Sequence, residues 1–226
     1  MRSQTTKVLC FDLDGTLLDS FPSHFEAYKR VFRKIGRNLS KEQFLNAYSP
    51  NWHQMYIGLE VPLDYWESLD ESWRREIRKM PSVAFAGVKK ALERLGRHFM
   101  LAVVSAGSRE RVISDLARNG IGSYFAEVIT GSDIQLRKPN PEGLIRAIHN
   151  LGVNNDQAIY IGDAEDDYQM AVSAGVDFIG IRSDFKNLKS EVTILIDHIE
   201  ELVELPLDPR NRIGASSHQP QARIKD

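Results

Sequence analysis

Short apolar runs alternate with amphipathic segments through the second half of the chain. The apolar runs predict strands at residues 99–104, 127–130, 158–161, 178–181 and 194–196. The amphipathic segments have apolar residues at helical spacing and predict helices at residues 87–95, 109–118, 141–151, 167–174 and 197–205. Strands that alternate with helices in this way are typical of a parallel sheet covered on both faces.

The first half of the chain has a different pattern. The apolar run VLCF at residues 8–11 predicts a buried strand near the beginning. Residues 21–82 show no strand signal, and their apolar spacing predicts helices at residues 24–36, 40–48 and 64–80. We therefore expect a core formed by residues 1–20 and 83–206, with a small helical domain, residues 21–82, inserted after the first strand.

Composition limits the class of protein. Apolar residues make up 42% and charged residues 27% of the 226 residues, which is ordinary for a soluble globular protein. The net charge of −2 gives no reason to expect a nucleic acid or an anionic membrane as a partner. The sequence shows neither a membrane-spanning run nor a signal-peptide core, and its single cysteine, Cys10, allows no internal disulfide, so we expect a cytoplasmic protein. Beyond Pro206 the composition predicts a disordered tail at residues 207–226.

Two aspartates follow the first predicted strand. Asp12 and Asp14 are separated by one residue, and side chains at i and i+2 of an extended chain point to the same side. They would then face one site at the carboxyl end of the strand, where ligands bind in open α/β sheets. Two carboxylates this close repel each other, and a divalent cation that prefers oxygen ligands would neutralise them. Taken alone, Asp14-Gly15 would predict only a surface turn.

Two further segments suit an anionic ligand. Ser105 follows a predicted strand, and its hydroxyl, with the backbone N–H groups of Ala106 and Gly107, would hold phosphate oxygens ahead of a helix. The alternative is a serine that only caps a helix or a turn. Lys138 stands in the segment RKPNP, where two prolines stiffen the backbone and would fix the position of a compact positive charge. The alternative is a solvated lysine, and we expect the neighbouring Arg137 to face solvent or to support the site.

The segment GDAEDD at residues 162–167 places four carboxylates at the start of a predicted helix. The helix dipole stabilises a carboxylate there by about 0.3–1 kcal/mol, which explains one or two acids better than four. A metal site explains more directly why four carboxylates lie so close together in the sequence. Asp163, at the end of the strand, is then the best ligand, and Asp167, one helical turn on, is a ligand, a water-mediated ligand or a partner of Lys138. We expect Glu165 and Asp166 to be solvated.

Taken together, these segments resemble the four motifs of the haloacid-dehalogenase-like hydrolase superfamily. The pentad DLDGT at residues 12–16, then Ser105, Lys138 and the pattern Gly-Asp-x-x-x-Asp ending at Asp167 follow in the same order and after predicted strands. The resemblance covers residues 7–182, and the phosphoglycolate-phosphatase-like subgroup looks closest. It implies a doubly wound, Rossmann-like α/β core with a helical cap inserted after the first motif. Dehalogenases proper lack the second aspartate, so Asp14 counts against dehalogenation.

The resemblance also implies a reaction. It is that of a Mg²⁺-dependent phosphatase, which hydrolyses a small phosphorylated metabolite through an aspartyl-phosphate. Asp12 would be the nucleophile, and Asp14 the general acid and then the general base. Lys138 would act on the transferred phosphoryl group together with Ser105 and Ala106. The groups implied as Mg²⁺ ligands are the Asp12 carboxylate, the Asp14 carbonyl, Asp163 and, directly or through water, Asp167.

Other interpretations remain open at the level of sequence. A sugar-phosphate mutase of the β-phosphoglucomutase type would use the same aspartyl-phosphate, and a non-catalytic binding protein could be built on the same fold. His24, in the connection to the cap, would position Asp14 as the cap closes, or would be a plain hinge residue. Arg74, Arg75 and Arg78 of the cap could bind an anionic part of the substrate. We expect at least two of them to lie on a solvated helix face instead. The sequence predicts neither the metabolite nor the oligomeric state.

Overall fold

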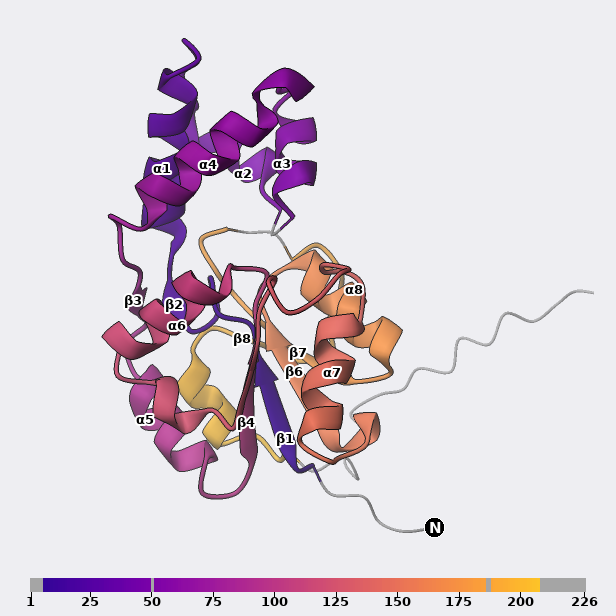
Figure 1. Ribbon diagram of the computed structural model, residues 1–226. Coiled ribbons are helices and arrows are strands. Elements are labelled where there is room, and N and C mark those ends of the chain that lie inside the picture. Colours follow the sequence, from indigo (N-terminus) through magenta and orange to yellow (C-terminus); the bar gives the residue numbers. More distant parts are fainter. Residues whose placement is uncertain (1–5, 50, 186–187, 208–226) are drawn as a thin grey trace, which may run out of the picture.

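A six-stranded sheet forms the centre of the computed structural model, which describes residues 6–49, 51–185 and 188–207. The strands lie in the order β5-β4-β1-β6-β7-β8, and every neighbouring pair is parallel. They are β1 (Val8–Phe11), β4 (Met100–Val104), β5 (Glu127–Ile129), β6 (Ala158–Gly162), β7 (Asp177–Ile181) and β8 (Leu195–Ile196). This order places β1 between β4 and β6, in the interior of the sheet (Figure 1).

Helices cover both faces of the sheet (Figure 1). The helices of this part are α5 (Val88–Leu95), α6 (Arg109–Arg118), α7 (Glu142–Asn150), α8 (Glu165–Ala174) and the 3₁₀-helices η2 (Gly122–Tyr124), η3 (Asn155–Gln157) and η4 (Ile199–Val203). Leu9 and Phe11 of β1 pack in one apolar cluster with α5, α6 and η4, whereas Val8 and Cys10 pack in the other with α7 and α8. Since successive side chains point to opposite faces, a strand buried on both sides needs an unbroken apolar run. The predicted doubly wound α/β core is confirmed.

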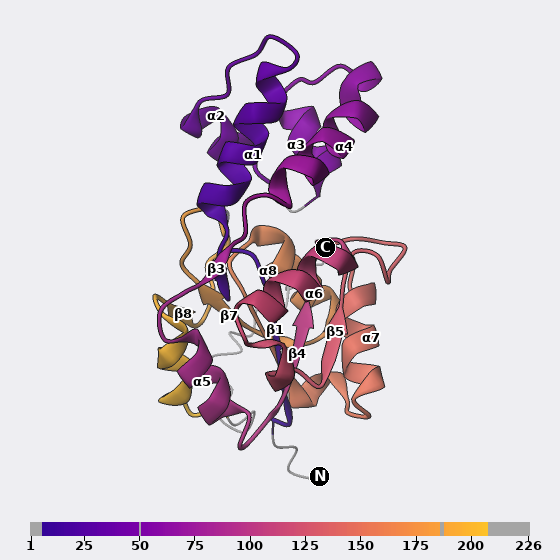
Figure 2. The same ribbon diagram turned by 60° about the vertical axis from the view of Figure 1, so that its left-hand side comes forward.

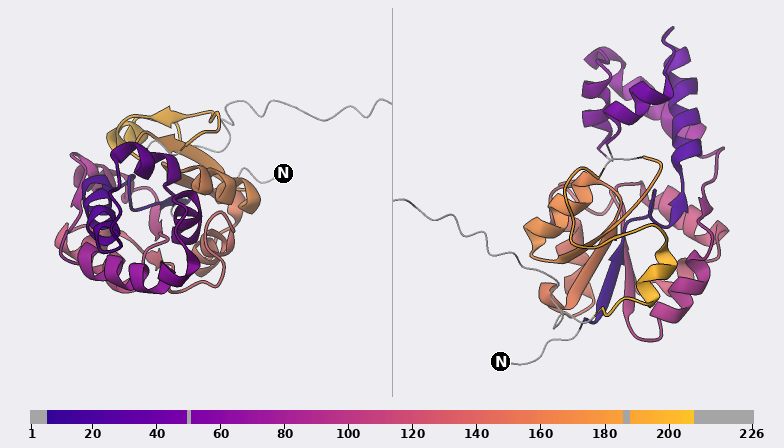
Figure 3. Two further views of the ribbon diagram at one scale, coloured as in Figure 1. Left: turned by 90° about the horizontal axis from the view of Figure 1, so that it is seen from above. Right: turned by 180° about the vertical axis from the view of Figure 1, so that it is seen from behind.

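A group of helices stands above the carboxyl ends of the strands (Figure 2; seen from above in Figure 3). It consists of α1 (Phe21–Arg33), α2 (Lys41–Ala47), α3 (Trp52–Gly58), the 3₁₀-helix η1 (Leu63–Tyr65) and α4 (Trp66–Ile77). Tyr28, Phe32 and Phe44 lie in an apolar cluster of their own there, separate from the two clusters on the sheet. Phe185, from the chain that follows β7, packs into this cluster, so part of the core contributes to the packing of the cap.

Two short strands connect the helical group to the core. β2 (Leu18–Asp19) leads into α1 and pairs antiparallel with β3 (Val83–Ala84), which leads back to the core. The pairing brings the two connections side by side. Strands of two residues show no alternating pattern, so the sequence did not predict them. The division into a core of residues 1–20 and 83–206 and a cap of residues 21–82 stays a prediction, and β2 and β3 lie at its two borders.

Several helix boundaries differ from the predicted ones. α1 begins at Phe21, three residues before the predicted start, because Pro22 fits the first turn of a helix, where its missing N–H needs no partner. The helix Trp52–Gly58 was not predicted; the Asn51 side chain caps it by accepting from the His53 N–H at 3.2 Å. The helix predicted at residues 197–205 is the shorter 3₁₀-helix η4.

Two further expectations concern the C-terminal tail and membrane-spanning segments. The tail predicted to be disordered, residues 207–226, lies outside the described residues except for Leu207. Within the described ranges, no helix is both long enough and apolar enough to cross a membrane.

Candidate active site

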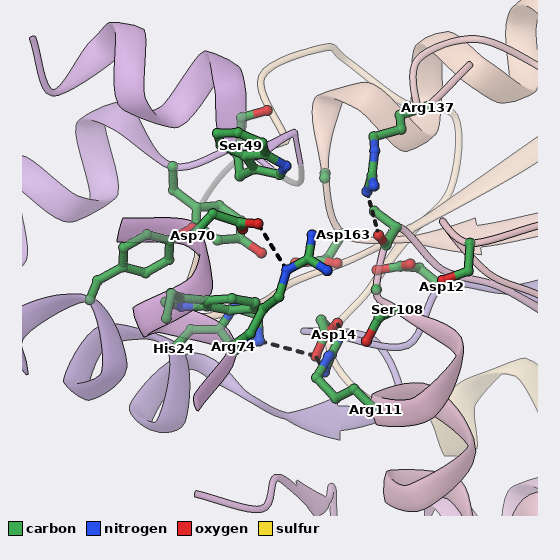
Figure 4. A pocket seen from close by; sticks show the side chains of 18 residues that line it. Asp12, Asp14, His24, Ser49, Asp70, Arg74, Ser108, Arg111, Arg137 and Asp163 are labelled. Atoms are coloured by element: carbon green, nitrogen blue, oxygen red, sulfur yellow. Dashed lines mark hydrogen bonds and ion pairs between the residues drawn. The ribbon is translucent and has the colours of Figure 1, made fainter. Parts of the chain in front are cut away.

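The order of the strands brings the predicted site residues together. Asp12, Ser105 and Asp163 directly follow β1, β4 and β6, which are neighbours in the sheet. Parallel strands end at the same edge, so these residues meet beneath the cap. Asp12, Asp14 and Asp163 line one pocket there (Figure 4). Lys138 reaches Asp12 from the loop before α7, so segments far apart in the sequence build one site.

Lys138 is the centre of a buried hydrogen-bonding network. Its Nζ donates to Asp12 Oδ1 at 2.6 Å, to Asp167 Oδ1 at 2.7 Å and to the Tyr160 hydroxyl oxygen at 2.8 Å. The Lys138 side chain is only 3% exposed, and two carboxylates compensate its charge. The sequence left Asp167 as a metal ligand, a water-mediated ligand or a partner of Lys138. The structure shows it in contact with Lys138. The sequence did not reveal Tyr160, because a tyrosine in an apolar run looks like a core residue.

Three buried carboxylates form an acidic cluster. Asp12, Asp163 and Asp167 each offer an oxygen, and these oxygens lie within 4.8 Å of one another. Burial, helped by the charge of Asp167, raises the pKa of Asp12 to about 7 against the lowering effect of the Lys138 charge. Burial and the charges of Asp12 and Asp167 also hold the pKa of Asp163 well above its ordinary value. The cluster would bind a cation because a cation relieves both the burial of charge and the repulsion.

Asp163 is held in place by hydroxyl groups and by a close backbone contact. Its Oδ1 accepts from Thr16 Oγ1 at 3.2 Å and its Oδ2 accepts from Ser183 Oγ at 2.5 Å. The carboxylate lies directly against Gly15, where a Cβ atom would come within 2.3 Å of Oδ2. Gly15 also has φ +81°, which favours glycine, so both its conformation and its small size are required here.

The carboxylate of Asp14 contacts two basic side chains and is not one of the three that form the acidic cluster. Arg111 on α6 donates to both of its oxygens, from Nη1 to Oδ1 at 3.0 Å and from Nη2 to Oδ2, and His24 Nε2 lies 3.5 Å from Oδ1. Burial would raise the pKa of Asp14, but the positive charge of Arg111 and the contact with His24 hold it well below its ordinary value. The metal ligand expected from Asp14 is its backbone carbonyl oxygen. The contacts of the carboxylate do not test that expectation, which stays a prediction.

Arg111 is the main residue of the site that sequence analysis missed. It also contacts Asp115, four residues on, at 3.3 Å. A basic and an acidic residue at this spacing usually form a surface pair, so the pattern gave no sign that Arg111 is buried beside Asp14.

The loop after β4 forms another wall of the site. The Ser105 hydroxyl accepts from the Gly107 N–H at 3.1 Å, which shapes the turn, while Ala106 and Gly107 line the pocket. Arg137 donates from Nη1 to the Ala106 carbonyl oxygen at 2.9 Å and therefore supports this loop. A Cβ at Gly131 would come within 2.4 Å of the same oxygen, so Gly131 also packs directly against this loop.

The pocket lies between the cap and the core and encloses about 120 Å³. Its core side carries Asp12, Asp14 and Asp163 (Figure 4). Its cap side carries aromatic residues, including Tyr48 and Trp73. Tyr48 stacks on Phe185 with ring centroids 4.1 Å apart. A pocket with carboxylates on its core side and aromatic rings on its cap side suits a small molecule with one strongly charged end.

Two acids expected to be solvated have partners instead. Glu165 accepts hydrogen bonds from the backbone N–H groups of Lys189 and Ser190 and from the Ser190 hydroxyl, so it holds the chain between β7 and β8. Asp166 accepts from Ser49 Oγ at 3.2 Å and thereby links α8 to the cap. The expectation was wrong because both contacts join parts of the chain that are distant in sequence.

Comparison with family models gives the class of protein. Residues 9–181 match the haloacid dehalogenase-like hydrolases, which is more than half of the chain. The chain therefore belongs to this family, as the motifs predicted, and is an enzyme of a hydrolase family.

Individual relatives narrow the resemblance. The phosphoglycolate phosphatase of Vibrio parahaemolyticus is 27% identical over 223 residues, which cover 91% of this chain and 98% of that protein. A solved haloacid-dehalogenase-superfamily hydrolase from Geobacter sulfurreducens is 27% identical with a TM-score of 0.67, covering 88% of this chain and 95% of that one. A candidate β-phosphoglucomutase from Thermotoga maritima, 21% identical with a TM-score of 0.67 and covering 88% and 97%, shares the fold. The predicted resemblance to the phosphoglycolate-phosphatase-like subgroup, whose named members are phosphoric monoester hydrolases, is confirmed.

Proposed function

We propose that this hydrolase releases inorganic phosphate from a small phosphate monoester, with Mg²⁺, through a covalent intermediate on Asp12. One observation carries the proposal: Asp12 lies beneath a capped pocket with the Lys138 ammonium 2.6 Å away and two further buried carboxylates beside it. A nucleophilic carboxylate needs such positive groups, because the phosphoryl group that it attacks is itself negatively charged. The relatives named phosphoglycolate phosphatase support a phosphate ester as the substrate.

Asp12 would take the phosphoryl group. One carboxylate oxygen bonds to phosphorus as the bond from phosphorus to the alcohol oxygen breaks, which leaves an aspartyl-phosphate. Water then attacks this phosphorus, and the bond to Asp12 breaks to release phosphate. Lys138 favours the ionised form of Asp12 despite its burial and places a positive charge where negative charge gathers. Ala106 and Gly107 line the pocket where their N–H groups would receive phosphoryl oxygens.

The acidic cluster fits Mg²⁺, which prefers hard oxygen ligands. Asp12 and Asp163, with the carbonyl of Asp14, would hold the ion. Asp167, whose oxygens already accept hydrogen bonds from Lys138 and from the Ala164 N–H, would support it indirectly. When bound, the ion supplies charge neutralisation at the phosphoryl oxygens.

Asp14 would transfer protons in both steps. Paired with Arg111 it is ionised, which is the form that takes a proton from the attacking water. To protonate the leaving alcohol it must first bind a proton, and the Arg111 pair opposes that. The carboxylate must therefore move away from Arg111 for the first step, and His24, which packs against Trp73 of the cap, lies where cap movement would affect it.

Asp14→Asn should slow phosphate release by about 10²–10⁴-fold, because the amide keeps the shape but cannot exchange a proton. Initial rates at saturating substrate measure this loss. Asp19→Asn is the matched control, since Asp19 is a nearby acid outside the pocket. A loss of less than about tenfold for Asp14→Asn would show that another group transfers the proton.

The proposed function is tested by a phosphate-release screen over phosphorylated metabolites. We expect release with Mg²⁺, none after EDTA treatment, and recovery when Mg²⁺ is returned. Ca²⁺ should restore little, because it takes more ligands at longer distances than an octahedral site offers. Full activity in EDTA would contradict the metal assignment, and no release from any ester would contradict the function.

The same screen separates the mutase alternative, which shares the intermediate on Asp12. A phosphatase admits water to the aspartyl-phosphate, whereas a mutase must exclude it and present a sugar hydroxyl. We expect stoichiometric phosphate release without a bisphosphate activator. Isomerisation of a sugar phosphate that outpaces phosphate release, and only after bisphosphate priming, would favour the mutase.

A further inference from the structure

Arg111 lines the pocket and is almost completely buried. Its side chain is 9% exposed, whereas those of Arg74, Arg75 and Arg78 in the cap are more than half exposed. In Figure 4 the Arg111 side chain points toward Asp14. Its Nε is buried and has no hydrogen-bond partner among the described residues. A buried guanidinium costs free energy unless anions pair with it, so the anions within its reach decide what it does.

Gly107 makes the room for this guanidinium. A Cβ at Gly107 would come within 2.4 Å of Arg111 Nη2 and 3.1 Å of its Cζ, so a larger residue there would displace the group. Gly107 lines the pocket beside Ala106, in the loop that would receive the phosphoryl oxygens. The guanidinium therefore lies against the part of the chain that the proposed reaction assigns to phosphate.

Two carboxylates share the Arg111 guanidinium. Nη1 and Nη2 donate to the two oxygens of Asp14, and Nη1 also donates to Asp115 Oδ2 at 3.3 Å. In the proposed first step Asp14 turns to the leaving oxygen, and Nη2 then has no acceptor among the described residues. Asp115, on the same helix α6, still holds the guanidinium in place. The group is thus positioned to receive a second anion where the Asp14 carboxylate had been.

The transferred phosphoryl group needs a positive partner besides Lys138. Lys138 and a bound Mg²⁺ would together only balance the three carboxylates of the acidic cluster, and a phosphoryl group brings about two more negative charges. Among the described arginines of the pocket, Arg137 already donates to the Ala106 carbonyl oxygen, and Arg74 belongs to the cap. Arg111 remains, with donors that the first step frees.

We infer that Arg111 binds an oxygen of the transferred phosphoryl group once Asp14 has turned away, so that Arg111 is a further catalytic residue. The inference rests on the proposed function. The guanidinium exchanges one anion for another, and its charge stays beside the loop after β4 throughout the step. The competing role is one limited to holding Asp14, in which Arg111 never contacts the phosphate.

Inorganic phosphate, the product, tests this contact in a double-mutant cycle. Calorimetric titration with Mg²⁺ present gives its Kd for the wild type, Arg111→Met, Asp14→Asn and the double variant. Arg111→Met should weaken binding by about 10- to 100-fold in the Asp14→Asn background, where no Asp14 carboxylate competes for the guanidinium. The loss should be smaller in the wild-type background. Arg111→Lys should recover part of the affinity, since it restores the charge without the paired donors. Arg118→Met, which removes an exposed positive charge from the same helix, should change nothing.

The outcomes separate this inference from the function on which it rests. Equal phosphate affinity of Asp14→Asn with and without Arg111→Met would show a role limited to Asp14 and overturn the contact, while the phosphatase function stands. Far-UV circular dichroism checks the fold of each variant. If Arg111→Met does not fold, Arg111→Gln, which keeps a polar group beside Asp115, takes its place with the same expectation. If the wild type neither binds phosphate nor hydrolyses any ester with Mg²⁺, the proposed function is overturned, and the inference with it.

Discussion

Asp12→Asn is expected to reduce phosphate release by more than about 10³-fold, because the amide has the shape of the carboxylate but is a poor nucleophile. The residue is buried at the end of β1, and the Lys138 ammonium that contacts it also contacts Asp167 and Tyr160. Lys138 therefore keeps a charged partner in the variant, and the fold should remain intact. Steady-state rates with Mg²⁺ and the best ester from the screen measure the loss.

The variant also tests the covalent step directly. Acid quenching during turnover, followed by mass spectrometry, should detect a phosphorylated wild-type chain and no phosphorylated Asp12→Asn chain. Far-UV circular dichroism should give matching spectra for the two proteins, which shows that the loss is chemical. Turnover near the wild-type rate, or a phosphorylated variant chain, would show that Asp12 is not the group that carries the phosphate.

The core could be predicted from the sequence because its constraints are local. The residues of β1 are buried on both faces, and a strand in that position needs an unbroken run of apolar residues, which VLCF provides. The polar residues that directly follow such runs must lie at one edge of a parallel sheet. Asp12, Ser105 and Asp163 could therefore be named as neighbours before their contacts were known.

The parts that were missed depend on contacts between distant segments. Arg111 and Asp14 are 97 positions apart, and no pattern near either residue indicates that they form a buried pair. The hydroxyl of Tyr160 bonds to Lys138 only because β6 lies beside the loop that carries the lysine. β2 and β3 pair with each other although the whole cap lies between them in the sequence, and neither strand has a sequence signal of its own.

The role of Lys138 gives the second large expected effect. Lys138→Met keeps a side chain of similar length and removes the charge, which leaves Asp12, Asp163 and Asp167 buried with no ammonium among them. Removing one partner of a buried ion pair costs about 3–5 kcal/mol. We expect a loss of this size in the free energy of unfolding of the metal-free protein, measured in urea. Activity with Mg²⁺ should fall by about 10²-fold or more, since the charge no longer stabilises the phosphoryl group.

The pH dependence of stability separates the loss of this charge from a simple packing defect. Burial raises the pKa of Asp12 to about 7 even beside Lys138, and without Lys138 it should rise further. A carboxyl whose pKa is raised by folding binds its proton more tightly in the folded protein, so stability is retained at low pH and lost as the pH rises through the folded pKa. The free energy of unfolding of metal-free Lys138→Met should therefore go on falling above about pH 7, where Asp12 of the wild type is already ionised and adds no further loss. Mg²⁺ should recover part of this stability but not the activity, and Lys89→Met, on the exposed surface, should match the wild type. A loss of stability independent of pH would indicate that the side chain matters only for its packing.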